Sequence, residues 1–414
     1  MKPAKNIQTI LKIETMKQTW RWFGPNDEIT TDAMLQAGVE GVVTSLYHLP
    51  TGQIWPVEEI NLRQQQIATR EDGSPSGLTW DVVESLPVSE SVKTQTGDWQ
   101  GHIEAYKQSL QNLAKCGLTT VCYNFMAVLD WTRTCLRSKM PNGSYAMRFD
   151  VIDFAIFDIH LLQRSNAQSD YPKPVRDQAT LRFKSMSKEQ RDELEHNIVA
   201  GLPGANDNWT IEDVRNLLSK YDNIDADKLR CNLIDFLNAV TPVAAELGIK
   251  LCCHPDDPPF NLLGLPRIMS SLEDYSKIMN AVDHPSNGIT LCTGSLGVKP
   301  DVNFIKFIEE WGSRIHFVHL RNTQREAIDG SKMYNFFESE HLGGDTDLVA
   351  VIRSLLNEEQ RRMREGRSDF EIPMRPDHGQ ELLDDLRRNS LPGYPLIGRL
   401  KGLAELRGIM AALK

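Results

Sequence analysis

Eight short apolar runs, separated by segments with helical periodicity, constrain the fold of this 414-residue chain more than any other feature. Several runs are unbroken rather than alternating, as expected of parallel strands that are covered on both faces. Strands that alternate with helices in this way predict an α/β fold, a (β/α)8 (TIM) barrel, with an open doubly wound sheet as the alternative. The expected strands are residues 18–24, 41–46, 78–85, 119–124, 249–253, 289–292, 315–320 and 372–376.

The interval between the fourth and fifth expected strands is too long for a single connecting helix. It contains polar segments of helical character, so we expect a helical insertion at about residues 130–225 on a barrel loop. A lid, an oligomer contact and a passive decoration all fit its composition. With the insertion included, residues 18–414 are expected to form one catalytic domain. Residues 1–17 are expected to be a disordered N-terminal extension.

Composition excludes several classes of protein. A net charge of −10 argues against binding to nucleic acid or to anionic membranes. No apolar run approaches the ~20 residues that span a bilayer, and the N-terminus lacks the apolar core and cleavage site of a signal peptide. The seven cysteines are scattered and form no CxxC pair, which predicts a reduced, cytoplasmic protein.

Four consecutive strands, the fifth to the eighth, end in residues that bind metals. On a barrel the chemistry lies at the carboxyl ends of the strands, where neighbouring strands are about 5 Å apart. Imidazole, thiolate and carboxylate groups there can converge on one transition-metal ion. The residues in question are His254, Cys292, His319 and Asp377.

Each of these residues also has an ordinary structural explanation. A single histidine on an apolar strand is commonly a satisfied core residue, and Cys292 could be a small buried apolar group. If Cys292 is a ligand, its soft thiolate favours Fe²⁺, Mn²⁺, Co²⁺ or Zn²⁺ over Mg²⁺.

The stretch from Met374 to Gly379 places the carboxylate of Asp377 beside the imidazole of His378. Adjacent side chains of a strand point to opposite faces, so both can serve one site only where the strand stops. If Asp377 binds a metal, His378 lies where it could move a proton. Tyr394, on a later loop rich in glycine and proline, is a second candidate for proton transfer, although most such tyrosines are surface residues.

Further polar or aromatic residues near the strand ends are candidates for substrate binding. An anionic substrate would be held by one or two arginines, whereas the alternative for each arginine is a structural ion pair. The candidates are Arg21, Trp22, Asn124, Arg321 and Arg375.

Longer stretches around these residues resemble the mannonate dehydratase family. The similar segments run from about Gln18 to Gly408, insertion included, so the resemblance covers nearly the whole chain. Small departures occur at Asn322 and at residues 342–344. The segments include TWRWFGPND, TVCYNFMAVLDWTRT, HPDDPPFNLLGLPRI, LCTGSLGV, HFVHLRNT, MRPDHG and PGYPLIGRLKGLAELRG.

The resemblance implies a xylose-isomerase-like TIM barrel that uses Mn²⁺ or Fe²⁺. It implies a lyase, specifically a hydro-lyase, that dehydrates the sugar acid D-mannonate to 2-keto-3-deoxy-D-gluconate in hexuronate (glucuronate) catabolism. The family's metal ligands fall on the four strand-end residues named above, and its proposed proton-transfer residues fall on His378 and Tyr394. The polar helical insertion leads us to expect a homo-oligomer.

Other functions remain open at this point. A metal-dependent aldose–ketose isomerase and a related sugar-acid dehydratase could use the same barrel. Isomerase sites usually rely on ligands rich in carboxylates, which one cysteine, two histidines and one aspartate fit less well. A sugar-acid-binding barrel that has lost catalysis is a third alternative, against which the presence of His378 and Tyr394 argues.

Overall fold

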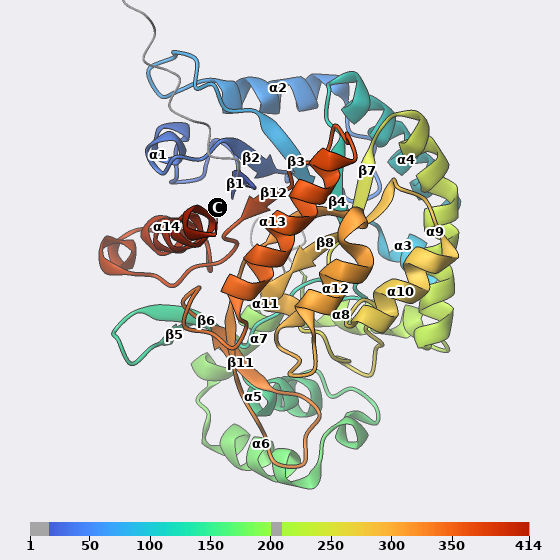
Figure 1. Cartoon of the computed structure of the whole chain (residues 1–414). Coiled ribbons are helices and arrows are strands. Elements are labelled where there is room, and N and C mark those ends of the chain that lie inside the picture. Colours follow the sequence, from blue (N-terminus) through green and yellow to red (C-terminus); the bar gives the residue numbers. More distant parts are fainter. Residues whose placement is uncertain (1–15, 200–208, 414) are drawn as a thin grey trace, which may run out of the picture.

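The computed structural model describes residues 16–199 and 209–413, and in these ranges eight parallel strands close into a barrel (Figure 1). Around the barrel their order is β1-β12-β9-β8-β7-β4-β3-β2. The predicted (β/α)8 barrel is therefore confirmed, and each strand overlaps its expected run. The strands are β1 (Lys17–Arg21), β2 (Gly41–Thr44), β3 (Trp80–Glu84), β4 (Thr120–Tyr123), β7 (Lys250–Cys253), β8 (Asn287–Cys292), β9 (Ile315–His319) and β12 (Pro373–Arg375).

The chain enters the barrel slightly earlier than the sequence suggested. Lys17 is already the first residue of β1, and Met16 before it is fully buried. Residues 1–15, which make up most of the expected extension, lie outside the described residues.

Helices surround the barrel, as Figure 1 shows. Side-chain caps explain where several begin: the Asp98 carboxylate, for example, accepts a hydrogen bond of 3.1 Å from the amide of Gly101. Among the described residues, no helix is long and apolar enough to cross a membrane. The helices of the barrel are α1 (Thr31–Gln36), α2 (Val57–Ala68), α3 (Glu90–Thr94), α4 (Trp99–Lys115), α9 (Ala226–Glu246), α10 (Leu272–Ala281), α11 (Thr293–Leu296), α12 (Phe304–Trp311), α13 (Leu348–Arg364) and α14 (Leu396–Ala412).

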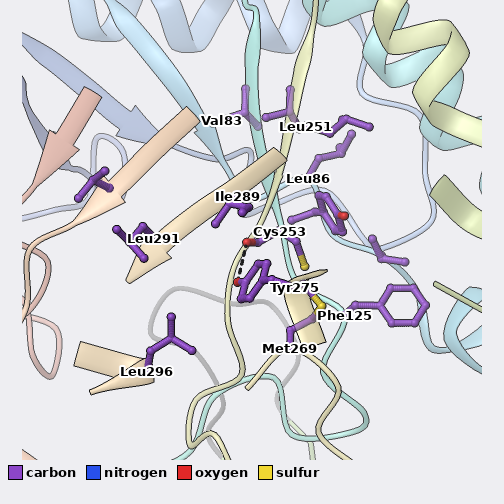
Figure 2. Packing of buried hydrophobic residues seen from close by; sticks show 14 of the residues in the cluster. Val83, Leu86, Phe125, Leu251, Cys253, Met269, Tyr275, Ile289, Leu291 and Leu296 are labelled. Atoms are coloured by element: carbon purple, nitrogen blue, oxygen red, sulfur yellow. Dashed lines mark hydrogen bonds between the residues drawn. The ribbon is translucent and has the colours of Figure 1, made fainter. Parts of the chain in front are cut away.

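The main core fills the space between the strands and these helices. Figure 2 shows apolar side chains of β7 and β8, among them Leu251 and Ile289, packed together with Tyr275 of α10. The hydroxyl of Tyr275 donates a 3.2 Å hydrogen bond to the carbonyl oxygen of Cys253. All of these side chains are fully buried, and burial of each apolar one stabilises the fold by about 1.5–3 kcal/mol. This packing anchors the strand ends from which the site is built.

The insertion after β4 contains helices, as expected, and also a β-hairpin. Its two strands join two strands of the loop after β9 in a second, antiparallel sheet with the order β10-β11-β6-β5. The expectation of a helical insertion was therefore incomplete. Figure 1 shows this sheet beside the barrel, with α5 and α6 beyond it. The elements are β5 (Cys135–Lys139), β6 (Tyr145–Phe149), β10 (Thr323–Glu326), β11 (Asn335–Glu338), α5 (Val151–Ile156), α6 (Lys173–Ser185), α7 (Lys188–Val199) and α8 (Ile211–Leu218).

The final helix, α14, begins tightly against the segment that follows β12. The Asp385 carboxylate accepts hydrogen bonds of 2.9–3.1 Å from three successive amides at the helix start, the last of them on Gly398. A Cβ atom added to Gly398 would lie 1.9 Å from the backbone oxygen of Gln380. Glycine is therefore required here for close approach of two backbones.

Replacement of Gly398 by alanine should consequently destabilise the protein by about 1–3 kcal/mol, because the backbone it meets cannot move aside cheaply. Gly408→Ala in the same helix is the matched control, since nothing lies within 4 Å of the added Cβ. There alanine should leave stability unchanged or raise it by up to ~1 kcal/mol. Free energies of unfolding from urea titrations compare the two variants, and equal values would contradict the role given to Gly398.

Candidate active site

Three metal-binding side chains meet at the carboxyl ends of three adjacent strands. His254 follows β7, Cys292 ends β8 and His319 ends β9. One potential ligand atom from each lies within 4.8 Å of the other two. The sequence pattern placed these residues on neighbouring strands, and the structure brings them together.

The hydrogen bonds of His254 show that its ring suits a metal ion. Its Nδ1 lies 2.7 Å from the backbone oxygen of Pro255, so Nδ1 carries the hydrogen and the lone pair is on Nε2. That lone pair faces Nδ1 of His319 at 3.2 Å. Burial also lowers the pKa of His254, which favours the neutral ring that metals bind. A donated hydrogen bond to a carbonyl is the usual support of a histidine ligand.

The sulfur of Cys292 is buried and lies close to hydrogen-bond donors of Ser295. It accepts contacts from the backbone amide of Ser295 at 3.4 Å and from the hydroxyl of the same residue at 3.2 Å. The three residues together therefore form a possible metal-binding group with one soft and two imidazole donors.

Asp377 lies beside this group but is not one of its three members. Its Oδ2 is 3.7 Å from Nδ1 of His319 and 3.8 Å from the sulfur of Cys292. Its Oδ1 is paired with Arg375, and Arg321 contacts Oδ2 at 3.3 Å. Burial opposes ionisation, but Arg375 and other nearby cations hold the pKa of Asp377 well below its usual range. The carboxylate is thus charged and adjacent to the metal-binding group.

A turn lets Asp377 and His378 face the same cavity. The strand β12 ends at Arg375, and Asp377 has a φ of 65°, in the left-handed region that aspartate tolerates better than most residues. The carbonyl of Pro376, just before, is contacted by Nε2 of His341 at 2.7 Å. This turn breaks the alternation that would otherwise send the two side chains to opposite faces.

His378 and Tyr394 form a buried pair in this cavity. Nε2 of His378 is 3.1 Å from the hydroxyl of Tyr394, and the ring of Trp131 meets the imidazole edge-on at a centroid distance of 6.0 Å. Burial lowers the pKa of His378 and raises that of Tyr394. Near neutral pH the two groups are therefore a neutral base and a neutral acid in contact, the combination that proton transfer requires.

Four of the five substrate-binding candidates line the same cavity, namely Arg21, Asn124, Arg321 and Arg375. Trp22 does not line it. The centre of its ring instead lies 5.6 Å from the guanidinium of Arg63, so Trp22 packs against that side chain. Arg21 and Trp22 are neighbours at the end of β1, and of the two Arg21 faces the cavity.

Three further charged residues belong to the site, and two of them, Glu84 and Glu338, were missed by the sequence analysis. Glu84 ends β3 and contacts Arg375 at 2.8 Å, and the strand-end rule applied to the third strand would have found it. Asp257 is held by Arg133 and Arg321, each at 2.8 Å. Glu338 comes from the second sheet, where no signal at a barrel strand end could have revealed it.

The arginines of the site are mostly occupied by these carboxylates. Arg321 pairs with Asp257 at 2.8 Å and Glu338 at 3.1 Å, in addition to its contact with Asp377. In Arg21 the terminal nitrogen Nη2 is buried and has no hydrogen-bond partner within the described part of the chain. Nε of Arg321 and of Arg375 also has no hydrogen-bond partner there, but Nη2 of Arg21 is a terminal nitrogen with two hydrogens to donate.

Comparison with known proteins identifies the family. Residues 16–414 match the family model of D-mannonate dehydratase (UxuA). A mannonate dehydratase of Rhizobium meliloti is 54% identical over 398 residues, which cover 96% of this chain and 97% of that one. The chain belongs to the D-mannonate dehydratase family. Mannonate dehydratase 1 of Agrobacterium fabrum is likewise 54% identical over 399 residues, with 96% and 97% coverage.

A solved member of the D-mannonate dehydratase family has the same architecture. The crystal structure of mannonate dehydratase from Streptococcus suis serotype 2 superposes with a TM-score of 0.72 at 30% identity, and covers 96% of this chain and 93% of that one. The resemblance drawn from the sequence segments is therefore confirmed over nearly the full length, insertion included.

If Cys292 is a ligand, Cys292→Ser should lower the metal affinity by at least about 10-fold, because a hydroxyl is a poor substitute for a thiolate. Cys231→Ser is the matched control, since Cys231 is exposed and free. Metal bound per chain, measured by mass spectrometry after dialysis against a graded chelator, compares both variants with the parent protein. Equal retention in Cys292→Ser and the parent would remove Cys292 from the ligand set.

Proposed function

We propose that this protein is a hydro-lyase that dehydrates D-mannonate to 2-keto-3-deoxy-D-gluconate and water. One observation carries the proposal: His254 of the metal-binding group and the His378–Tyr394 pair line one arginine-lined cavity. Membership of the D-mannonate dehydratase family supports it independently. Membership of this family also supports a role in hexuronate (glucuronate) catabolism.

His254, Cys292, His319 and, as a fourth ligand, Asp377 would hold a divalent ion, which we propose to be Mn²⁺ or Fe²⁺. The soft sulfur donor supports these ions over Mg²⁺. Such an ion supplies Lewis acidity, which stabilises the negative charge that develops on the substrate when the proton beside its carboxylate is removed. The two imidazoles and the sulfur fit such an ion because their ligand atoms already lie close together.

The chain's own residues would bind and orient the sugar acid. The unpaired Nη2 of Arg21 is suited to the substrate carboxylate, because charge-assisted hydrogen bonds are strong in a buried site. Asn124, which donates to Asp130 at 2.8 Å, lines the same cavity and presents polar groups suited to sugar hydroxyls. Arg321 and Arg375 would act mainly by fixing the carboxylates around the site.

Proton transfer is assigned to His378 and Tyr394. The reaction breaks the C2–H bond and the C3–O bond, forms a C2–C3 double bond and releases the C3 hydroxyl as water. One residue of the pair takes the C2 proton while the other protonates the departing hydroxyl, and the resulting enol then becomes the keto acid. The 3.1 Å contact between the pair allows a proton to return between turnovers.

We further propose that the enzyme is a cytoplasmic homo-oligomer. All seven cysteines are free, in keeping with a reducing compartment. The polar insertion offers a surface for contacts between subunits.

The direct test is incubation with D-mannonate followed by detection of the 2-keto-3-deoxy product. Activity should disappear after chelation and return with Mn²⁺ or Fe²⁺. Full activity of the metal-free protein would show that the metal ion has no part in catalysis. Interconversion of aldoses and ketoses without keto-deoxy product would instead favour an isomerase.

Replacement of His378 by asparagine, or of Tyr394 by phenylalanine, should lower kcat by about 10²–10⁴-fold, because each removes one proton-transfer group. Metal content should stay that of the parent, since neither residue belongs to the metal-binding group. Steady-state kinetics and metal analysis on the same preparations test both statements. Turnover close to that of the parent would take the residue out of the mechanism.

A further inference from the structure

His341 is a buried histidine outside the metal-binding group, and its ring contacts the turn that follows β12. It lies in the loop between β11 and α13, and only 3% of its surface is exposed. Its Nε2 lies 2.7 Å from the carbonyl oxygen of Pro376. A carbonyl oxygen can only accept, so Nε2 carries a hydrogen and donates it. The mechanism described so far gives this hydrogen bond no task.

The turn formed by residues 376–378 has little other backbone support. The backbone on either side of it, at Arg375 and at Gly379, is held by hydrogen bonds of 3.0 Å to other segments. Within the turn, the backbone makes one hydrogen bond to the described part of the chain, and its donor is His341. The conformation of the turn therefore depends on this side chain.

The bond acts on the peptide unit that joins Pro376 to Asp377. That unit is planar, so the direction of its carbonyl also sets the direction of its N–H, and with it φ of Asp377. At 65° this φ is unfavourable for a residue that has a Cβ atom. Rotation of the peptide unit to a negative φ would relieve the strain. It would also turn the carbonyl away from His341 and redirect the side chain of Asp377.

His341 is itself fixed by two elements of the barrel. The side-chain amide of Asn322, just after β9, donates a 2.8 Å hydrogen bond to the backbone oxygen of His341. Gly402 of α14 leaves room for the ring, because a Cβ atom there would lie 2.1 Å from Cε1 of His341. The imidazole is thus held against the turn and can determine how the turn is oriented.

We propose that His341 is a positioning residue, which holds the peptide unit before Asp377 so that the carboxylate of Asp377 and the imidazole of His378 face one cavity. It acts through the backbone and touches neither the substrate nor a metal ion. The proposal rests on the proposed function and deepens it, because it names what keeps a ligand and a proton-transfer group together.

His316 offers a matched control for removal of the bond. Its Nε2 lies 2.9 Å from the carbonyl oxygen of Pro285, and 4% of its surface is exposed. Its ring also lies against a glycine, since a Cβ atom on Gly288 would be 2.1 Å from Cδ2 of His316. His316 is near the start of β9, whereas the site is at the end of that strand. His316→Leu therefore removes a similar bond from similar surroundings outside the site.

His341→Leu should weaken Mn²⁺ binding and lower kcat on D-mannonate, each by about 10–100-fold, because Asp377 and His378 lose their common orientation. His316→Leu should match the parent in both quantities, although both variants lose stability. Chelator competition, steady-state kinetics and urea titrations on the same preparations give the three measurements. A loss in either quantity that His316→Leu does not share supports the role of His341. Parent-like values of both in His341→Leu, or equal losses in the two variants, would overturn it.

Two further variants keep the proposal testable if His341→Leu fails to fold. His341→Gln retains an N–H donor and should retain most of the Mn²⁺ affinity and kcat. Gly402→Ala keeps His341 but displaces its ring, so it should lower both, whereas Gly408→Ala in the same helix should lower neither. Parent-like values in Gly402→Ala, or loss of both quantities in folded His341→Gln, would contradict the proposal.

The two proposals fail in different ways. A parent protein that makes no product from D-mannonate would contradict the proposed function, while Mn²⁺ affinity would still test the role of His341. An active parent protein, together with a His341→Leu variant that matches it in kcat and Mn²⁺ affinity, would contradict the role of His341 alone.

Discussion

Balanced buried charge is the constraint on which the rest of the site depends. Four arginines and four carboxylates, none more than 4% exposed, lie together at the mouth of the barrel. Removal of one partner from such a pair strands a buried charge and costs about 3–5 kcal/mol, so every member must be present for the others to remain. The arginines are Arg21, Arg133, Arg321 and Arg375, and the carboxylates are Glu84, Asp257, Glu338 and Asp377.

This network fixes the groups that would do the chemistry. Arg375 and Arg321 clamp Asp377 beside His319 and Cys292, and the turn at Asp377 then directs His378 toward Tyr394. Arg321 and Arg375 are already paired with carboxylates of the protein. They therefore orient the site and contribute less to binding of the substrate. The unpaired terminal nitrogen of Arg21, Nη2, is left for an incoming anion. Rigid placement of this kind supplies much of the rate enhancement of an enzyme.

Local sequence patterns predicted the barrel and much of its site, because each strand end is a local signal. The apolar runs predicted all eight barrel strands. The residues at the carboxyl ends of these runs included His254, Cys292 and His319. Trp22 was a substrate-binding candidate, but it does not line the cavity, and its ring lies beside the guanidinium of Arg63.

The second sheet was harder to predict. Asn142-Gly143, a strong hairpin signal between β5 and β6, was present and overlooked. The pairing of Phe149 with Phe336 joins segments far apart in the chain, and no local pattern announces it. Glu338 depends on that pairing, so its place beside His378 followed only from the structure.

Closure of the barrel has a consequence for synthesis of the protein. The strand β1 pairs on one side with β2, which follows it closely, and on the other with β12, where the side chain of Thr19 bonds to the carbonyl of Met374 across 355 positions. During translation one edge of β1 therefore remains unpaired until nearly the whole chain has left the ribosome. An open strand edge invites association with other chains. During synthesis, the unpaired edge of β1 must therefore be protected, either by the nascent chain itself or by a chaperone.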